Sequence, residues 1–263
     1  MGENMEKREL INQIKVWLRE AAGMIHEAST KKLTIDEKTN RKDLVTNMDR
    51  EIQSFLIDQV HIYNPEAKIL AEEEGYNELE NLDGQVFVID PIDGTLNFVL
   101  EQENFCIMIG VYENGVGQLG FIYDVMKEVL YWGGKGLGVY MDEQPLPKPQ
   151  NLRLANGLLG VNGYLLGYNR WNIRTIGEKS LGVRIYGCAG LEMIALLKGS
   201  HIGYIGNLSP WDYAAGNVLL DELGMKYSGI SGEKLKFKGR EYYLGATPQA
   251  YKEIRELLDQ PQK

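Results

Sequence analysis

The chain has 263 residues, of which 44% are hydrophobic and 25% are charged, a balance typical of a folded globular protein. This length suffices for one large α/β domain or for two closely packed lobes. The formal net charge is −9 and the basic residues form no patch, so we expect no nucleic-acid polymer as a partner. An acidic protein that binds an anionic substrate needs a cation between the two, which predicts carboxylates placed for metal binding.

Cysteine usage and the first residues indicate a cellular compartment. Cys106 and Cys188 are the only cysteines and lie outside any CxxC pattern, so this pattern predicts neither a zinc site nor a disulfide framework. The first residues lack the apolar core of a signal peptide, and no apolar run approaches membrane-spanning length. We therefore expect a protein of the reducing cytoplasm that does not contact a membrane.

The first third of the chain contains two helical patterns and two short apolar runs. The apolar residues at helical spacing in the first pattern are Leu10, Ile14, Trp17, Leu18, Ala21 and Ile25, and those in the second are Leu44, Met48, Ile52, Phe55 and Leu56. Residues 29–43 between them are polar and Lys-rich, which predicts a mobile loop, and Asn64-Pro65 should end the second helix. The runs at 68–71 and 86–89 predict strands that lead directly into carboxylates.

Glycines and prolines divide the rest of the chain. The β-rich segments 105–112, 117–123, 128–132 and 138–141 predict an antiparallel meander, and the glycine run at 133–138 fits a hairpin turn better than a phosphate loop. The proline-rich stretch that begins at Pro145 should separate an N-terminal α+β lobe, residues 1–145, from a C-terminal α/β lobe, residues 150–263. Helices are predicted near 189–198, 210–223 and 249–259.

The most informative segment runs from Asp90 through Pro91, Ile92, Asp93 and Gly94 to Thr95, directly after an apolar strand. If a short helix begins here, the N–H groups of its first turn favour a phosphate group. The two carboxylates beside it are hard oxygen ligands, which suit Mg²⁺. Because Asp and Pro are also common turn residues, this segment alone could simply end a strand.

Two further acidic groups could complete such a site. Glu72-Glu73-Glu74 follows the strand at 68–71, and Trp211-Asp212 opens a late helix. Each has a structural alternative: Asp212 suits the N3 position of a helix with Ser209 as N-cap, and residues 72–80 could form a solvated acidic loop. Glu74, Glu78 and Glu80 are predicted to be solvated. Convergence of the three acidic groups would create a site that binds more than one metal ion.

Four motifs together resemble the inositol monophosphatase family, within the superfamily of lithium-sensitive, magnesium-dependent sugar phosphatases. The motifs are Leu44–Asp49, Ala71–Glu73, Asp90–Thr95 and Trp211–Gly216, and they stand in the family's order. The match covers nearly the whole chain. The resemblance implies a layered αβαβα sandwich and a Mg²⁺-dependent phosphomonoesterase with two to three ions per site.

The resemblance also implies roles for individual residues. Glu72, Asp90 and the carbonyl of Ile92 would bind one ion, Asp90, Asp93 and Asp212 a second, and Glu72 a weaker third. Thr95, paired with Asp49 and assisted by Glu72, would orient and deprotonate the attacking water. Substrate contacts would come from Asp93, Gly94, Thr95, Asp212 and the loop formed by Gly187, Cys188 and Ala189. Cys188 replaces the family's usual Ser or Thr, and we favour a packing or contact role for it over a nucleophile.

A second departure from the family pattern concerns the alcohol half of the substrate. Ile205 stands where inositol-specific members carry a Glu that contacts the ring, unless it merely continues a buried strand. Inositol 1-phosphate, sugar bisphosphates, the 2′-phosphate of NADP and 3′-phosphoadenosine 5′-phosphate all remain candidate substrates. A noncatalytic regulatory binding protein is the alternative from another class, and the presence of every ligand and catalytic residue disfavours it. The resemblance makes a homodimer the expected assembly.

Overall fold

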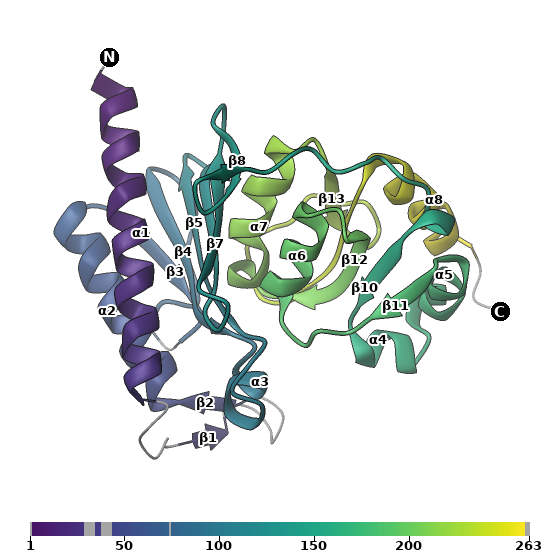
Figure 1. Ribbon diagram of the computed structural model, residues 1–263, viewed down its shortest axis with the longest axis horizontal. Helices are drawn as coiled ribbons and strands as arrows, with labels where there is room; N and C mark the ends of the chain where they lie inside the picture. Colours follow the sequence, from purple (N-terminus) through teal and green to yellow (C-terminus); the bar gives the residue numbers. More distant parts are fainter. Residues whose placement is uncertain (1, 29–34, 38–43, 74, 261–263) are drawn as a thin grey trace.

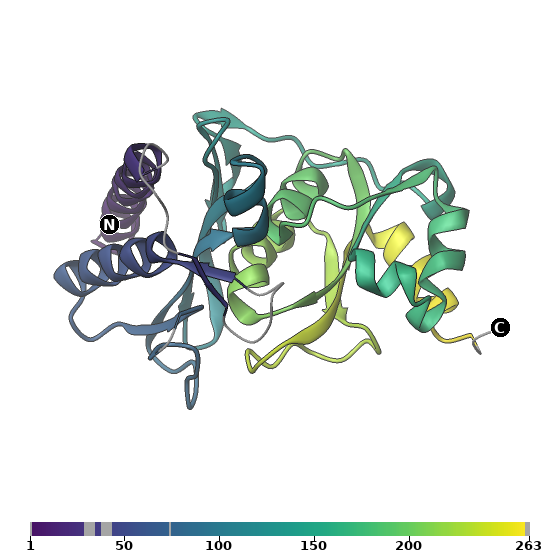
Figure 2. The same cartoon turned by 90° about the horizontal axis from the view of Figure 1, so that it is seen from below.

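Alternating layers of helices and sheets make up the computed structural model, which describes residues 2–28, 35–37, 44–73 and 75–260 (Figure 1 and Figure 2). One pair of helices covers a seven-stranded sheet, and a second pair lies between that sheet and a five-stranded sheet. Further helices cover the outer face of the five-stranded sheet. This arrangement is the predicted αβαβα sandwich. None of the described helices is both long and apolar enough to cross a bilayer.

The outermost layer consists of α1 (Gly2–Ala28) and α2 (Asn47–Tyr63). The predicted apolar stripe of α1 is buried, and α2 ends directly before Asn64-Pro65 as expected. The second helix begins three residues later than Leu44, because Thr46 forms a capping box with Asp49. Leu44 instead belongs to β2 (Leu44–Thr46), which pairs antiparallel with β1 (Ile35–Glu37). The prediction of a loop over 29–43 was therefore wrong at 35–37, and its remaining residues lie outside the described part of the chain.

The seven-stranded sheet follows chain order from β3 to β9. Its strands are β3 (Lys68–Ala71), β4 (Gln85–Asp93), β5 (Cys106–Glu113), β6 (Val116–Asp124), β7 (Val129–Gly134), β8 (Gly138–Met141) and β9 (Gln144–Pro145). Only β3 and β4 pair in parallel, and the rest form the predicted antiparallel meander. The glycine run joins β7 to β8 as the expected hairpin turn.

The central layer consists of α6 (Ala189–Leu197) and α7 (Pro210–Glu222). Two strand glycines let α7 approach the seven-stranded sheet closely. A Cβ on Gly120 would lie 2.3 Å from the Ala215 carbonyl oxygen, and one on Gly110 would lie 3.1 Å from backbone atoms of α7. This close approach fixes the position of α7, and therefore of the carboxylate in its first turn, relative to β4 and β5.

The five-stranded sheet has the order β11-β10-β12-β14-β13. Its strands are β10 (Leu158–Val161), β11 (Gly182–Arg184), β12 (His201–Leu208), β13 (Lys226–Gly229) and β14 (Glu241–Ala246). Its outer face is covered by α4 (Gly163–Gly167), α5 (Ile173–Lys179) and α8 (Pro248–Leu258), with 3₁₀ turns at Leu154–Asn156 and Arg170–Asn172.

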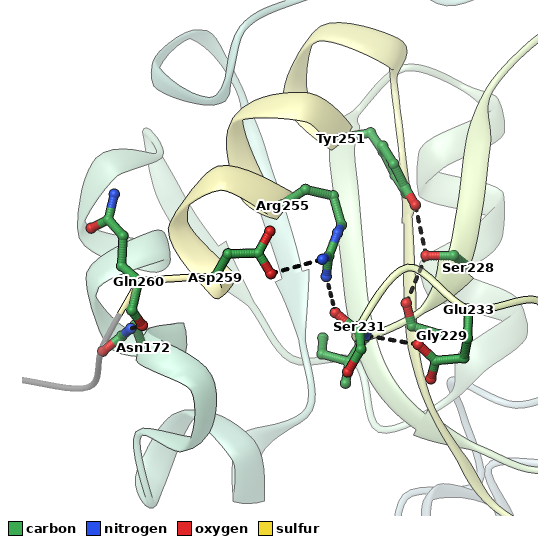
Figure 3. A network of polar contacts seen from close by, with 10 residues as sticks. Asn172, Ser228, Gly229, Ser231, Glu233, Tyr251, Arg255, Asp259 and Gln260 are labelled. Carbon is green, nitrogen blue, oxygen red and sulfur yellow. Dashed lines mark hydrogen bonds and ion pairs between the residues drawn. The ribbon is translucent and has the colours of Figure 1, made fainter.

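Polar contacts connect α8 to the end of β13 and the residues that follow it (Figure 3). The Tyr251 hydroxyl lies 2.6 Å from Ser228 Oγ, and the Arg255 guanidinium donates to the Ile230 carbonyl and to Asp259. The apolar face of α8, including Ile254, is buried on the sheet. This outer layer stabilises the five-stranded sheet and leaves the opposite face of the sheet to α6 and α7.

Candidate active site

A β-bulge in β4 brings Asp90 and Asp93 to one place. On a regular strand, side chains three residues apart point to opposite faces. Here Asp90 pairs with Met108 and Asp93 with Cys106, so three steps along β4 oppose two along β5. The extra residue reverses the alternation, and Pro91, which has no N–H to donate, is tolerated at such a bulge. Both carboxylates can therefore contribute to a single cluster.

Asp212 joins this cluster from the first turn of α7. One carboxylate oxygen from each of Asp90, Asp93 and Asp212 lies within 4.8 Å of the others, and all three residues are buried. The Oδ2 atom of Asp212 also accepts the Ser209 N–H at 2.8 Å, as in a capping box. The two interpretations of Asp212 from the sequence, helix cap and cluster member, are thus compatible.

A cavity of about 230 Å³ opens onto the three carboxylates. Among the residues predicted to form the site, those that line the cavity are Glu72, Asp90, Ile92, Asp93, Gly94, Thr95, Gly187, Cys188, Ala189 and Asp212. Glu72 follows β3 directly and is half-buried. Of the other acids near it, Glu78 and Glu80 are exposed as expected, whereas Glu74 lies outside the described residues.

Thr95 and Asp49 form a hydrogen-bonded pair beside the carboxylates. Gly94, with φ of 91°, is the N-cap of the predicted short helix, α3 (Thr95–Leu100). Thr95 Oγ1 lies 3.1 Å from Asp49 Oδ1 and 3.1 Å from the Ile92 carbonyl oxygen. Asp49 is fully buried, and its Oδ2 accepts from the Thr46 N–H at 2.8 Å and from the Thr46 hydroxyl at 2.6 Å. The cap of α2 therefore orients the carboxylate that contacts Thr95.

The start of α6 holds Asp93 from the opposite side. The N–H groups of Gly190 and Ala189 lie 2.5 Å and 3.2 Å from its carboxylate oxygens, and the Cys188 thiol donates to Oδ2 at 3.1 Å. Burial raises the pKa of Cys188 to about 12, so the side chain is a neutral thiol at neutral pH. This geometry favours a contact role over a nucleophile for Cys188.

The charge and burial of the carboxylate cluster favour binding of a cation. Burial raises the pKa of Asp93, although the N–H groups of Gly190 and Ala189 oppose the shift. Burial, and then the neighbouring Asp93 carboxylate, raise the pKa of Asp212 to about 7. Buried like charges at this spacing are unfavourable unless a proton or a cation neutralises them. A cluster made only of carboxylate oxygens fits the donor set that Mg²⁺ prefers.

The position of Ile205 differs from the predicted substrate contact, because this residue does not line the cavity. Its side chain is fully buried among the core residues between the five-stranded sheet and the outer helices. Neighbouring side chains on β12 alternate between faces, so Tyr204 lines the cavity while Ile205 points away from it. This position agrees with the alternative, in which Ile205 continues a buried strand.

Several cavity residues carried no sequence signal. Asn162, Ile185, Asn207 and Arg240 also line the cavity. Arg240 is exposed, donates to the Asn207 carbonyl at 3.1 Å and lowers the pKa of Asp212. It stands in an irregular segment before β14, where no motif or periodicity marks it. Its nearness to the carboxylates arises only in the folded chain, so the sequence contains no signal for it.

Comparisons with known proteins identify the family. The inositol monophosphatase family model matches residues 6–263. Inositol-1-monophosphatase of Bacillus subtilis (strain 168) is 40% identical, over 92% of this chain and 93% of the relative. Fructose-1,6-bisphosphatase/inositol-1-monophosphatase of Thermotoga maritima is 30% identical, over 76% of this chain and 77% of the relative.

Comparison with solved structures agrees with the family model and the relatives. A crystal structure of an IMPase/NADP phosphatase complexed with Mg²⁺ and phosphate has a TM-score of 0.89 and 25% sequence identity, and the match covers 97% of this chain and 96% of that one. The family model, the relatives and the solved structure therefore lead to one conclusion: the chain belongs to the inositol monophosphatase family, whose sugar phosphatase fold it shares.

Proposed function

We propose that the chain is a Mg²⁺-dependent phosphoric monoester hydrolase of small substrates, with inositol 1-phosphate as the first candidate. The observation that carries the proposal is the convergence of three buried carboxylates at a cavity lined also by Thr95, whose hydroxyl is hydrogen-bonded to the buried Asp49. Every residue expected to bind metal or move a proton is present, which argues against a noncatalytic role.

The proposed cation ligands are Glu72, Asp90 and the Ile92 carbonyl for one ion, and Asp90, Asp93 and Asp212 for a second. Glu72 would also contribute to a third ion, which gives two to three ions per site. Mg²⁺ bound there would act as a Lewis acid that lowers the pKa of water and neutralises charge on the phosphate. The raised pKa of Asp212 supports this assignment, because a cation removes the cost of burying its charge.

Thr95 and Asp49 provide the path for the proton of the attacking water. When the Thr95 hydroxyl donates to Asp49 Oδ1, the Thr95 oxygen keeps a lone pair that can accept a hydrogen bond from water in the cavity. Movement of the hydroxyl proton to Asp49 then lets Thr95 accept the proton of that water. Glu72, which lines the same cavity, is proposed to assist this proton transfer. The substrate phosphate would contact the N–H groups of Gly94 and Thr95 at the start of α3.

Arg240 favours a second candidate class, substrates that carry another anionic group on the alcohol. The guanidinium lies on the cavity wall and is suited to bidentate contact with a phosphate. The names of the Thermotoga maritima relative and of the IMPase/NADP phosphatase include substrates of this kind. Sugar bisphosphates, NADP and 3′-phosphoadenosine 5′-phosphate are therefore the alternatives to test against inositol 1-phosphate.

A phosphate-release screen over these substrates tests the proposal. We expect hydrolysis only with Mg²⁺ present. If Arg240 contacts a second phosphate, Arg240→Ala should lower kcat/KM for bisphosphates while leaving kcat/KM for inositol 1-phosphate largely unchanged. Absence of phosphate release from every substrate would contradict the proposed activity, and equal loss for both substrate classes would contradict the role of Arg240.

We further propose a cytoplasmic homodimer. Leu181, directly before the edge strand β11, and Tyr164 and Tyr168, at α4, are exposed apolar side chains that a paired copy would cover. Sedimentation equilibrium should give twice the mass of one chain, and Tyr168→Glu should shift the protein toward the monomer. A monomer at micromolar concentration would contradict this assembly.

A further inference from the structure

Two cysteine thiols meet beneath the floor of the cavity. Cys106 is the first residue of β5, and Cys188 is the N-cap of α6. Their Sγ atoms are 3.7 Å apart, and both side chains are buried. Because 82 positions separate them in the sequence, no cysteine spacing pattern could have predicted the pair.

Asp93 supplies a third donor atom to this pair. Its Oδ2 lies 3.6 Å from Cys106 Sγ and 3.1 Å from Cys188 Sγ. Tetrahedral zinc has Zn–S bonds of about 2.3 Å and Zn–O bonds of about 2.0 Å, which place two sulfurs about 3.8 Å apart and sulfur and oxygen about 3.5 Å apart. The three donor atoms therefore already have nearly the spacing of one face of a tetrahedral site.

Gly190 packs closely against these atoms. A Cβ at this position would lie 2.4 Å from Cys106 Sγ, 2.9 Å from Met108 Sδ and 3.2 Å from Asp93 Oδ2. A larger residue at position 190 would collide with these atoms, so the glycine lets the start of α6 approach Cys106 and Asp93 this closely. Met108, which is fully buried, packs beside the same glycine, and the thiolate ligands select soft metals over Mg²⁺.

We propose that Cys106, Cys188 and Asp93 form a binding site for a thiophilic divalent cation, Zn²⁺ or Cd²⁺. The cation enters through the cavity, because Cys188 and Asp93 line it. Each thiol releases its proton to solvent as its metal–sulfur bond forms, so binding frees two protons and needs no oxidant. Asp93 also belongs to the carboxylate cluster proposed for Mg²⁺, so occupancy of the thiol site inhibits the proposed hydrolysis.

A titration of the full chain with Cd²⁺ tests the site independently of catalysis. With the cysteines kept reduced by a phosphine and Mg²⁺ in excess, the cadmium–thiolate charge-transfer absorption should rise and saturate at one Cd²⁺ per chain. In Cys106→Val this absorption should largely disappear and the affinity should fall on the order of 100-fold, as expected for the loss of a metal ligand or its support. Cys188→Ser should reduce the absorption similarly.

Met108→Leu is the matched control, since it changes a neighbouring buried sulfur but keeps both thiols. It should retain the cadmium–thiolate absorption. Cooperative thermal unfolding of each variant establishes that it is folded. No charge-transfer absorption in the wild type, or equal absorption and affinity in folded Cys106→Val, would overturn the proposal. Inhibition of phosphate release by Cd²⁺ in the wild type but not in Cys106→Val is the expected functional consequence.

Discussion

At the scale of single residues, Asp49 links the start of a helix to the proposed chemistry. Its Oδ2 accepts two hydrogen bonds from Thr46, and its Oδ1 lies 3.1 Å from the Thr95 hydroxyl. A carboxylate held in this way has little freedom to rotate away from Thr95. The capping box of α2 therefore also sets the geometry of the proton acceptor.

Replacement of Thr95 by Ala should lower kcat by roughly 10²-fold or more, the scale of a positioned proton-transfer group. Binding of Mg²⁺ should change little, because the carboxylate cluster remains intact. Thr95→Ser retains the hydroxyl and should keep most of the activity. Steady-state kinetics at saturating Mg²⁺ check this expectation, and an unchanged kcat in Thr95→Ala would remove the Thr95–Asp49 pair from the mechanism.

The sequence predicted the carboxylate cluster better than the rest of the cavity wall, for a physical reason. Asp90, Asp93 and Thr95 lie close together on one strand end, so a short motif contains them. The rest of the cavity wall depends on which way β12 side chains face and on the irregular segment that contains Arg240, and neither leaves a local pattern. The sequence distance between Ile205 and Asp212 predicts a place near the substrate only if the Ile205 side chain faces the cavity, and that direction cannot be read from the sequence.

Ile205→Glu should therefore destabilise the protein rather than change its substrate preference. A carboxylate at this fully buried position has no described partner in its apolar surroundings, and such substitutions cost several kcal/mol. Ile205→Val, which removes one methylene, should cost about 0.5–1.5 kcal/mol. Urea unfolding measures the free energy of unfolding of both variants. A stable Ile205→Glu protein with increased selectivity for inositol 1-phosphate would contradict the placement of Ile205 away from the substrate.

At the scale of elements, the contact between α7 and the seven-stranded sheet positions Asp212. Gly120 permits this contact, since its hydrogen faces the Ala215 carbonyl where a Cβ would collide at 2.3 Å. Longer elements were predictable because their apolar periodicity or glycine boundaries are clear. The three-residue strands β1 and β2 were missed, since so short a segment shows no periodicity.

Gly120→Ala should reduce the free energy of unfolding by about 1–3 kcal/mol or more, because either α7 or the sheet must shift. The same shift moves Asp212 and should weaken Mg²⁺ binding in the folded variant. Gly23→Ala is the matched control: nothing lies within 4 Å of its Cβ position, and in a helix the change should be neutral or stabilise by up to about 1 kcal/mol. Equal unfolding midpoints and Mg²⁺ affinities for the two variants would contradict this account.

At the scale of the whole molecule, folding and metal binding are coupled through the buried acids. The pKa of Asp212 is about 7 in the metal-free fold, against roughly 3.9 for an unfolded Asp. Between these values the folded protein binds more protons than the unfolded chain, so its stability falls as pH rises through this window. The −9 net charge adds a general repulsion that a bound cation reduces.

Mg²⁺ should therefore raise the thermal unfolding midpoint more at pH 8 than at pH 5.5. At the lower pH a proton already neutralises Asp212 and competes with the cation. Scanning fluorimetry across this range, with and without Mg²⁺, measures the difference, and Asp212→Asn should reduce the pH dependence, to which Asp93 with its raised pKa also contributes. A stabilisation by Mg²⁺ that is largest at pH 5.5 would contradict the assignment of Asp212.

The central claim is that the cluster of Asp90, Asp93 and Asp212 holds the cation on which phosphate release depends. The most direct measurement is phosphate release from inositol 1-phosphate and from a sugar bisphosphate after thorough chelation and then after addition of Mg²⁺, in the wild type and in Asp93→Asn. The account predicts no release after chelation, recovery on addition of Mg²⁺ in the wild type, and almost none in the variant, whose amide keeps the size but loses the charge. Comparable release by the chelated wild type, or by Asp93→Asn in Mg²⁺, would contradict it.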